Sequence, residues 1–142
     1  MTELTLAIAG KILDAALAKA VEMKLKPVVV AVLDARGCLK IAAAHDGVSL
    51  LRGEIAHGKA YGALAMGIGS RGLFQRAQEQ SYFIGAVNTL AQGRMVPVPG
   101  GVLIQDDGVL LGAIGVSGDS SDNDEICAVA GIEAAGLQAN TG

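Results

Sequence analysis

The spacing of apolar residues predicts a helix near each end of the chain. Between residues 3 and 25, apolar side chains recur every three or four positions, and charged residues such as Lys11 fall on the opposite side. The same spacing returns near the end of the chain. There, Asp122 and Glu125 have the spacing of a capping box and predict the start of a closing helix.

Two pairs of short apolar runs predict two β-hairpins. Residues 28–33 form an unbroken, mostly β-branched run, typical of a central strand that is covered on both faces, and residues 38–44 follow as its partner. Farther on, apolar runs at 102–104 and 109–116 flank Asp106-Asp107-Gly108. A short Asp-Gly link between apolar runs is a strong hairpin signal.

Glycines within the second hairpin indicate that another backbone or a ligand comes close to the strand. Gly112 and Gly115 lie inside the last predicted strand, where glycine weakens pairing and usually marks a bulge or a place where another backbone or a ligand comes near. We expect the glycines between residues 100 and 118 to leave room for a ligand or for a neighbouring subunit.

The middle of the chain predicts three helices. Ser49 is placed to cap a helix over residues 50–66, and shorter helical patterns follow at 73–79 and 81–92. The intervening Gly67-Ile-Gly-Ser-Arg-Gly72 matches the G-x-G-x-x-G letters of a dinucleotide site, but a helix feeds it where that motif requires a strand. It is therefore interpreted as a helix-ending turn.

The order of elements predicts the fold class. Helix, hairpin, helices, hairpin, helix favours an α+β fold with one antiparallel sheet flanked by helices. A chain of 142 residues without repeats or linkers is expected to form a single domain over residues 1–142. Hydrophobic residues make up 51 % and charged residues 18 %. We expect part of so apolar a surface to meet other copies of the chain.

Charge and composition exclude several classes of partner. The net charge of −3, with two tyrosines, two phenylalanines and no tryptophan, gives no reason to expect nucleic acid or an anionic membrane. The first residues lack the basic region of a signal peptide, and no apolar run reaches the length of a membrane span, so the sequence predicts a cytoplasmic protein. Cys38 and Cys127 are interpreted as small buried hydrophobes.

The two histidines are the main candidates for chemistry. His45 and His57 could ligate iron or move a proton near neutral pH, but their separation matches no metal-binding spacing. Glu54 stands three positions before His57 on the predicted helix, where it could orient the imidazole or pair with it. Ser117 is interpreted as a turn serine, and the acidic residues between Asp119 and Glu125 as helix-start residues.

Several segments together resemble a known family. They are Pro27 to Asp34, His45-Asp-Gly47, Lys59-Ala60, Gly100-Gly101, Asp107-Gly108, Gly112-Ala-Ile-Gly-Val-Ser-Gly118, Asp124-Glu-Ile-Cys-Ala128 and Ala130-Gly-Ile132. In combination they are similar to the GlcG/HbpS family of haem-binding or haem-degrading-like proteins, which is also found as the C-terminal domain of PduO-type cobalamin adenosyltransferases. The resemblance covers nearly the whole chain and implies a profilin-like sheet flanked by helices, assembled into dimers or higher oligomers.

The resemblance also implies a set of site residues beside the second hairpin. The positions that match the family pattern are Asp46, Gly47, Lys59, Gly100, Gly101, Gly115, Ser117, Gly118 and Asp124. Some members of this family use a histidine on the first helix to bind haem iron, and this chain has none there, which leaves His45 or His57. Other candidate iron ligands are Met23, Met66, Met95, Tyr61 and Tyr82, and Arg52, Lys59, Arg71 or Arg94 could neutralise haem propionates.

These observations give a leading hypothesis and two alternatives. The leading one is a cytoplasmic, homo-oligomeric haem- or tetrapyrrole-binding protein, accessory to an operon of glycolate, diol or glycerol metabolism, with haem as its one expected cofactor. The first alternative is a small enzyme that acts on an oxygenated metabolite, with His57 or Asp124 as acid or base. The second is a structural or chaperone-like partner of a metabolic enzyme.

Overall fold

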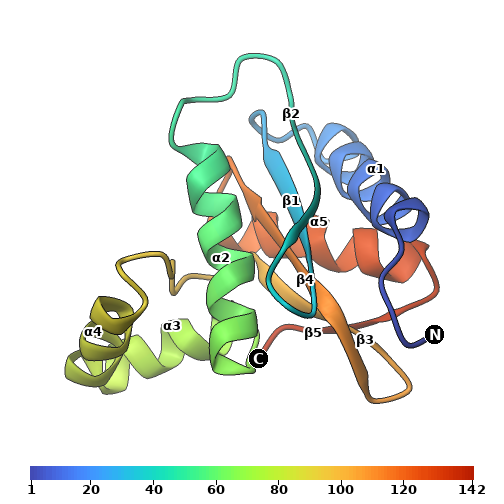
Figure 1. Ribbon diagram of the computed structural model, residues 1–142. Coiled ribbons are helices and arrows are strands. Elements are labelled where there is room, and N and C mark those ends of the chain that lie inside the picture. The colour runs from blue at the N-terminus through green and yellow to red at the C-terminus, as the bar shows by residue number, and fades with distance from the viewer.

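The computed structural model describes residues 1–142 and contains one sheet with helices on both faces (Figure 1). In chain order the elements are α1 (Leu6–Glu22), β1 (Val29–Asp34), β2 (Leu39–Ala44), α2 (Arg52–Met66), α3 (Ser70–Glu79), α4 (Ser81–Leu90), β3 (Gly101–Asp106), β4 (Val109–Ser117), α5 (Ser121–Ala134) and β5 (Gln138–Asn140). The strands pair antiparallel in the order β2-β1-β4-β3-β5. The predicted α+β class and both predicted hairpins are confirmed.

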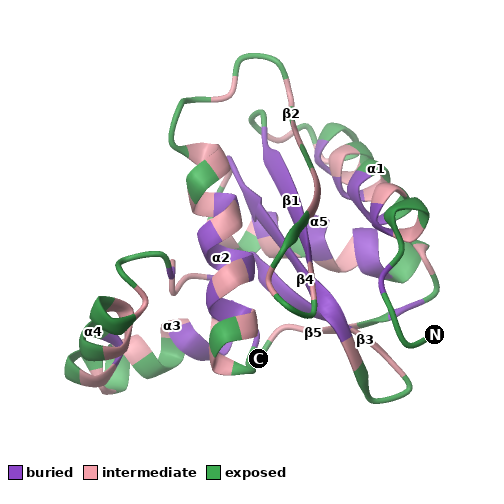
Figure 2. Ribbon diagram, viewed as in Figure 1, coloured by how far each residue is buried: buried purple, intermediate pink, exposed green.

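The sheet has a large hydrophobic core on one face and two smaller hydrophobic clusters on the other. Alternate residues of β1, such as Val30 and Val32, join the core that α1 and α5 cover. The residues between them, such as Ala31 and Leu33, face the side where α2 lies. Figure 2 shows β1 and β4 almost wholly buried at the centre of the sheet. The prediction that residues 28–33 form a strand covered on both faces is therefore confirmed.

Small residues let α2 lie close against the sheet. Ala56, Ala60 and Ala63 of α2 are fully buried. A Cβ added to Gly115 of β4 would overlap the carbonyl oxygen of Ala56, and one added to Gly101 of β3 would overlap the backbone carbonyl of the facing α2 turn. The space in front of these strand glycines is thus filled by the chain's own backbone. The expectation that they leave room for a ligand is wrong, and close helix-to-sheet packing is their role.

Two predicted helix starts are corrected by the structure. Helix α2 begins at Arg52, and the side chain of Ser49 does not cap it, because Leu51 occupies the cap position without a side-chain hydrogen bond. Helix α5 is capped by Ser120, whose hydroxyl accepts a hydrogen bond from the N–H of Asn123. The predicted capping box was therefore placed two residues late, and its two acidic residues serve elsewhere.

Those two acidic residues connect α5 to α3. Arg71 donates to the carboxylate of Glu125 at 3.0 Å and forms an ion pair with Asp122 at 2.6 Å. The turn before Arg71 behaves as predicted, because Gly67 ends α2 in the left-handed conformation at a φ of 69°. The glycine-rich segment is confirmed as a helix-ending turn.

Three further features differ from the prediction or complete it. The short strand β5 was not predicted; it pairs with β3 at the edge of the sheet.

The two cysteines differ in burial. Cys127 is buried as predicted, and burial raises the pKa of its thiol to about 11, whereas Cys38 is exposed, so the prediction that it is buried is wrong. None of the five helices combines the length and the apolar character that crossing a membrane requires.

The close seating of α2 predicts unequal effects of alanine at two glycines. We expect Gly115→Ala to lower the free energy of unfolding by about 3 kcal/mol or more, because its Cβ must displace the α2 backbone. Gly85→Ala in α4 meets no atom within 4 Å, so it should be neutral or stabilise by about 0.5–1 kcal/mol through helix propensity. Urea unfolding of both variants measures the contrast. Equal stabilities would contradict the packing described.

Candidate functional site

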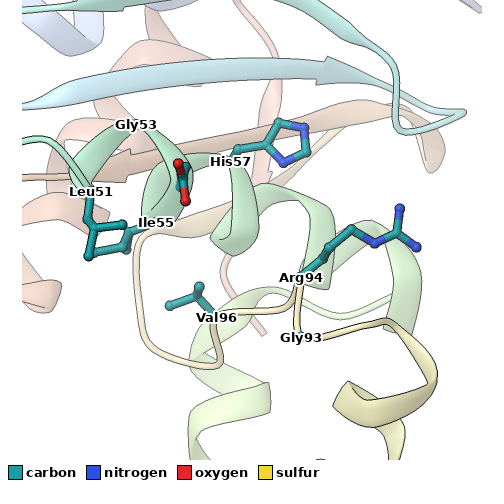
Figure 3. Close-up of a pocket in the computed structure, with 8 residues that line it drawn as sticks. Leu51, Gly53, Ile55, His57, Gly93, Arg94 and Val96 are labelled. Atoms are coloured by element: carbon teal, nitrogen blue, oxygen red, sulfur yellow. The ribbon is translucent and has the colours of Figure 1, made fainter.

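The largest hollow of the molecule is a groove along the outer side of α2. It has a volume of about 570 Å³ and lies between the first turns of α2 and the segment that follows α4 (Figure 3). Its lining residues are Leu51, Gly53, Glu54, Ile55, His57, Gly93, Arg94 and Val96. This volume falls within the roughly 300–1,000 Å³ that small-molecule sites usually occupy. The groove can therefore hold an organic ligand of the size of a drug or cofactor.

Tyr61 positions the two nitrogen-bearing side chains of the groove. The rings of His57 and Tyr61 stack one helical turn apart, with centroids 6.2 Å apart and planes 17° from parallel. The guanidinium carbon of Arg94 lies 4.5 Å from the centre of the same tyrosine ring. No hydrogen bond within the chain engages the His57 imidazole, and Glu54, predicted as its partner, shares the groove without bonding to it. The imidazole is thus oriented by stacking and free to bind a ligand.

His45 lies at the end of β2 and has a structural role. Its Nδ1 accepts a hydrogen bond of 3.2 Å from the backbone N–H of Val28, which closes the first hairpin. Asp46 beside it is exposed. His45 does not line the groove, so the structure does not bring the two histidines into one site.

Lys59 and Asp124 form a buried ion pair behind α2. The Lys59 Nζ donates to Asp124 Oδ2 at 3.0 Å and to the carbonyl oxygen of Val116 at 2.9 Å. Their side chains are only 2 % and 1 % exposed. The other oxygen of Asp124 accepts a hydrogen bond from the N–H of Asp119. Burial lowers the pKa of Lys59, and the carboxylate of Asp124 opposes that shift.

Glycine makes room for the lysine side chain at the end of the sheet. A Cβ on Gly100 would lie 2.8 Å from the Lys59 Nζ and 2.9 Å from its Cδ. Because α2 and α5 lie on opposite faces of the sheet, the lysine reaches past the ends of β3 and β4 to the first turn of α5. With 1 % of its side chain exposed, Asp124 is placed to hold the fold together and has no access to a substrate.

The remaining predicted residues lie near the start of α2. Ser117 is fully buried and its hydroxyl accepts a hydrogen bond of 3.3 Å from Arg52 Nη1. Gly47 and Gly118 line a smaller pocket with Arg52. Of the predicted set, His57 alone lines the groove, Lys59 and Asp124 form the buried ion pair, and Gly47 and Gly118 line the second pocket. His45 and Asp46 line neither hollow, so the predicted residues do not line one cavity. No group of three or more His, Cys, Asp or Glu side chains is arranged to hold a metal ion.

The sequence did not predict that the residues of the groove lie together. Arg94 was a candidate partner for propionates, but Val96 and Gly93 lie in a segment without regular structure and showed no local signal. Tyr61 was considered only as an iron ligand, and the structure shows it as the residue against which His57 and Arg94 pack. Its spacing of four residues from His57 on one helix was the available signal.

Comparison with known proteins finds a family model that matches most of the chain. A family model described as "Haem degrading protein HbpS-like" matches residues 4–133. An uncharacterized 15.0 kDa protein in the dhaT-dhaS intergenic region of Citrobacter freundii is 31 % identical over 130 residues, which are 92 % of this chain and 90 % of that protein.

A longer relative and a solved structure extend the comparison. The corrinoid adenosyltransferase PduO of Salmonella typhimurium is 34 % identical over 98 residues, which are 69 % of this chain but 29 % of that protein, so the chain spans less than a third of its length. The crystal structure of a PduOC:heme complex superposes with a TM-score of 0.87 at 28 % identity, covering 96 % of this chain and 97 % of the other.

The buried ion pair predicts a large loss of stability when one partner is neutralised. We expect Asp124→Asn to lower the free energy of unfolding by about 3–5 kcal/mol, because it leaves the Lys59 ammonium buried without a counter-charge. The matched control is Asp122→Asn, which removes an exposed pair and should cost less than about 1 kcal/mol. Urea unfolding measures both.

A double variant separates loss of charge pairing from loss of packing. Lys59→Met combined with Asp124→Asn removes both charges and keeps an apolar stem in the same space, so it should recover most of the lost stability. A double variant as unstable as Asp124→Asn alone would show that the pair is not the source of the effect.

Proposed function

The chain belongs to the HbpS-like family, and from that premise we propose that it binds haem or a related tetrapyrrole in the groove between α2 and residues 93–96. The observation that carries the proposal is the imidazole of His57, which is held by stacking on Tyr61 and is free of hydrogen bonds within the chain. Imidazole is one of the side chains that bind haem iron in proteins, and here it lies beside a hollow of about 570 Å³.

The other groove residues fit the chemistry of a tetrapyrrole. Leu51, Ile55 and Val96 offer an apolar wall to the flat macrocycle, and the Arg94 guanidinium offers charge-assisted hydrogen bonds to a propionate. Figure 3 shows His57 and Arg94 toward the same end of the groove and the apolar residues toward the other. Bound haem would supply an iron centre whose chemistry depends on its axial ligand. The residues of this chain bind, orient and partly shield it.

His57 is the better of the two candidate histidines. One ring nitrogen of His45 is already engaged by the backbone of Val28, and His45 stands outside the groove. Met95 is buried and Tyr82 projects from α4 into solvent, so neither faces the groove as His57 does. The PduOC:heme complex supports the proposal, because that protein shares this fold over nearly its whole length and binds haem.

The physiological setting is proposed from the relatives and the sequence. We infer a cytoplasmic accessory protein of an operon for glycolate, diol or glycerol metabolism, folded as a single domain over residues 1–142. The relative encoded in the dhaT-dhaS intergenic region, which matches over nearly its whole length, supports a single domain over these residues.

Hemin titration tests the proposal. We expect wild-type protein to give a Soret band with a saturable shift, and His57→Ala to bind hemin at least about tenfold more weakly, a change of ~1.4 kcal/mol. His45→Ala is the matched control and should titrate as the wild type does. A wild-type spectrum identical to that of free hemin would refute haem binding, and equal titrations of all three proteins would refute His57 as the ligand.

Helix α4 supports the proposal that the protein is a homo-oligomer. This helix has no charged residue, packs mainly on α3 and projects from the body of the molecule (Figures 1 and 2). Only Ile84 is buried, while Tyr82 and Leu90 are 75 % and 85 % exposed. An apolar helix in this position is stabilised when it packs against another copy. We infer that α4 lies in the contact between subunits.

Charge introduced on α4 should therefore dissociate the oligomer. We expect Tyr82→Glu combined with Leu90→Glu to run as a monomer in size-exclusion chromatography with light scattering, where the wild type runs as an oligomer. The control, Gln75→Glu combined with Gln78→Glu, adds the same charge to exposed positions of α3 and should leave the mass unchanged. A monomeric wild type would contradict the assembly itself.

A further inference from the structure

A second pocket lies beside the first turn of α2 and gathers positive charge. It has a volume of about 210 Å³, and its lining includes Lys26, Ser49 and Arg52 together with Gly47 and Gly118. These residues come from three segments that meet at one end of the sheet: the entry to β1, the loop from β2 to α2, and the end of β4. We call it the Arg52 pocket. It shares no lining residue with the groove.

Arg52 differs from every other arginine of the chain in having no partner for its charge. Arg36 and Arg71 form ion pairs with carboxylates. Arg76 and Arg94 lie over aromatic rings. Arg52 makes one hydrogen bond, to the neutral hydroxyl of Ser117. Its guanidinium has five N–H donors, so four remain for a ligand.

Lys26 brings a second unpaired cation to the same pocket. Neither its ammonium nor the Arg52 guanidinium takes part in any of the ion pairs of the structure. The buried Lys59 ammonium is close enough to Arg52 for the two charges to repel each other. The Asp124 carboxylate neutralises Lys59, so the net positive charge at the pocket comes from the Arg52 guanidinium, which bonds to a fully buried serine, and from the Lys26 ammonium.

The nearest acidic groups already have partners. The carboxylate of Asp119 accepts hydrogen bonds from the Asn123 side chain and from the N–H groups of Ser120 and Lys26, and these bonds, together with the nearby charge of Lys26, lower its pKa to about 2. Asp124 is paired with Lys59. Asp46, next to Gly47, is exposed to solvent. No acidic residue lines the Arg52 pocket.

We propose that the Arg52 pocket binds the oxyanion head group of a small metabolite, either a carboxylate or a phosphate. Arg52 supplies the planar donor pair that recognises such groups in bidentate fashion, Lys26 supplies charge, and Ser49 supplies a hydroxyl donor. The pocket's volume accommodates a ligand of only a few heavy atoms.

Calorimetric titration with two probes tests this inference. Inorganic phosphate and acetate are added separately to the full chain at constant ionic strength. We expect at least one of them to bind saturably with millimolar affinity or better. Binding of phosphate alone identifies a phosphorylated metabolite, and binding of acetate alone or of both identifies a site that accepts carboxylates.

Three variants connect the binding to the pocket. Arg52→Gln should weaken probe binding at least about tenfold, as expected for loss of a charge-assisted bidentate contact. Lys26→Gln should weaken it several-fold while leaving intact the backbone hydrogen bond of Lys26, so it remains informative if Arg52→Gln is unstable. Lys11→Gln, on the exposed side of α1, should bind as the wild type does. Absence of saturable binding, or equal binding by all variants, would overturn the inference.

Hemin titration of Arg52→Gln separates this pocket from the groove. Because the two sites share no lining residue, its hemin binding should match the wild type. If hemin binding were lost as well, the Arg52 pocket would be part of the haem site and the inference of an independent site would fail. If wild-type protein binds phosphate or acetate but no hemin, the inference stands and the proposed haem function fails.

Discussion

The buried contact between Lys59 and Asp124 determines how the two faces of this molecule fit together. It joins α2, on one side of the sheet, to the first turn of α5, on the other. Removing both charges from water is costly, and the arrangement is tolerated because the ammonium also reaches the Val116 carbonyl and the carboxylate also accepts from a backbone N–H. The small size of Gly100 is what gives the lysine its path.

The groove depends on the same helix, α2. Helix α2 directs Lys59 into the interior and His57 toward the groove, while Tyr61 packs at the edge of the core, so the depth at which α2 lies on the sheet also places the groove residues. Depth in turn depends on Gly101 and Gly115, because any side chain there would meet the α2 backbone. Glycines that do not line the groove thus influence it through the position of the helix backbone. This dependence accounts for the family-like glycines without assigning them a direct binding role.

The sequence allowed prediction of elements whose signal is local and periodic, and of little that depends on contacts between distant segments. Both hairpins followed from apolar runs around Asp107-Gly108 and the earlier turn. Strand β5 was missed because its three residues carry no periodic pattern. The glycines of β4 were misread for a similar reason: a strand glycine signals that something comes close, but the sequence cannot say whether it is a ligand or the protein's own helix. The groove needed the structure, since Val96 joins His57 only through tertiary folding.

Polar side chains of the same type differ here in whether the chain itself supplies their hydrogen-bond or charge partners. That difference separates structural residues from candidate binding residues better than residue type does. Lys59 and Arg52 are seven positions apart on α2. Lys59 has a carboxylate and a carbonyl as partners, whereas Arg52 has a single neutral hydroxyl. The two histidines divide in the same way, since a backbone N–H occupies a nitrogen of His45, whereas stacking leaves both nitrogens of His57 free. A charge or ring nitrogen that folding orients but does not saturate keeps its binding capacity for a molecule from outside. By this criterion α2 carries one structural cation on its inner side and two unsaturated groups that face separate hollows, and these hollows are where binding should be sought.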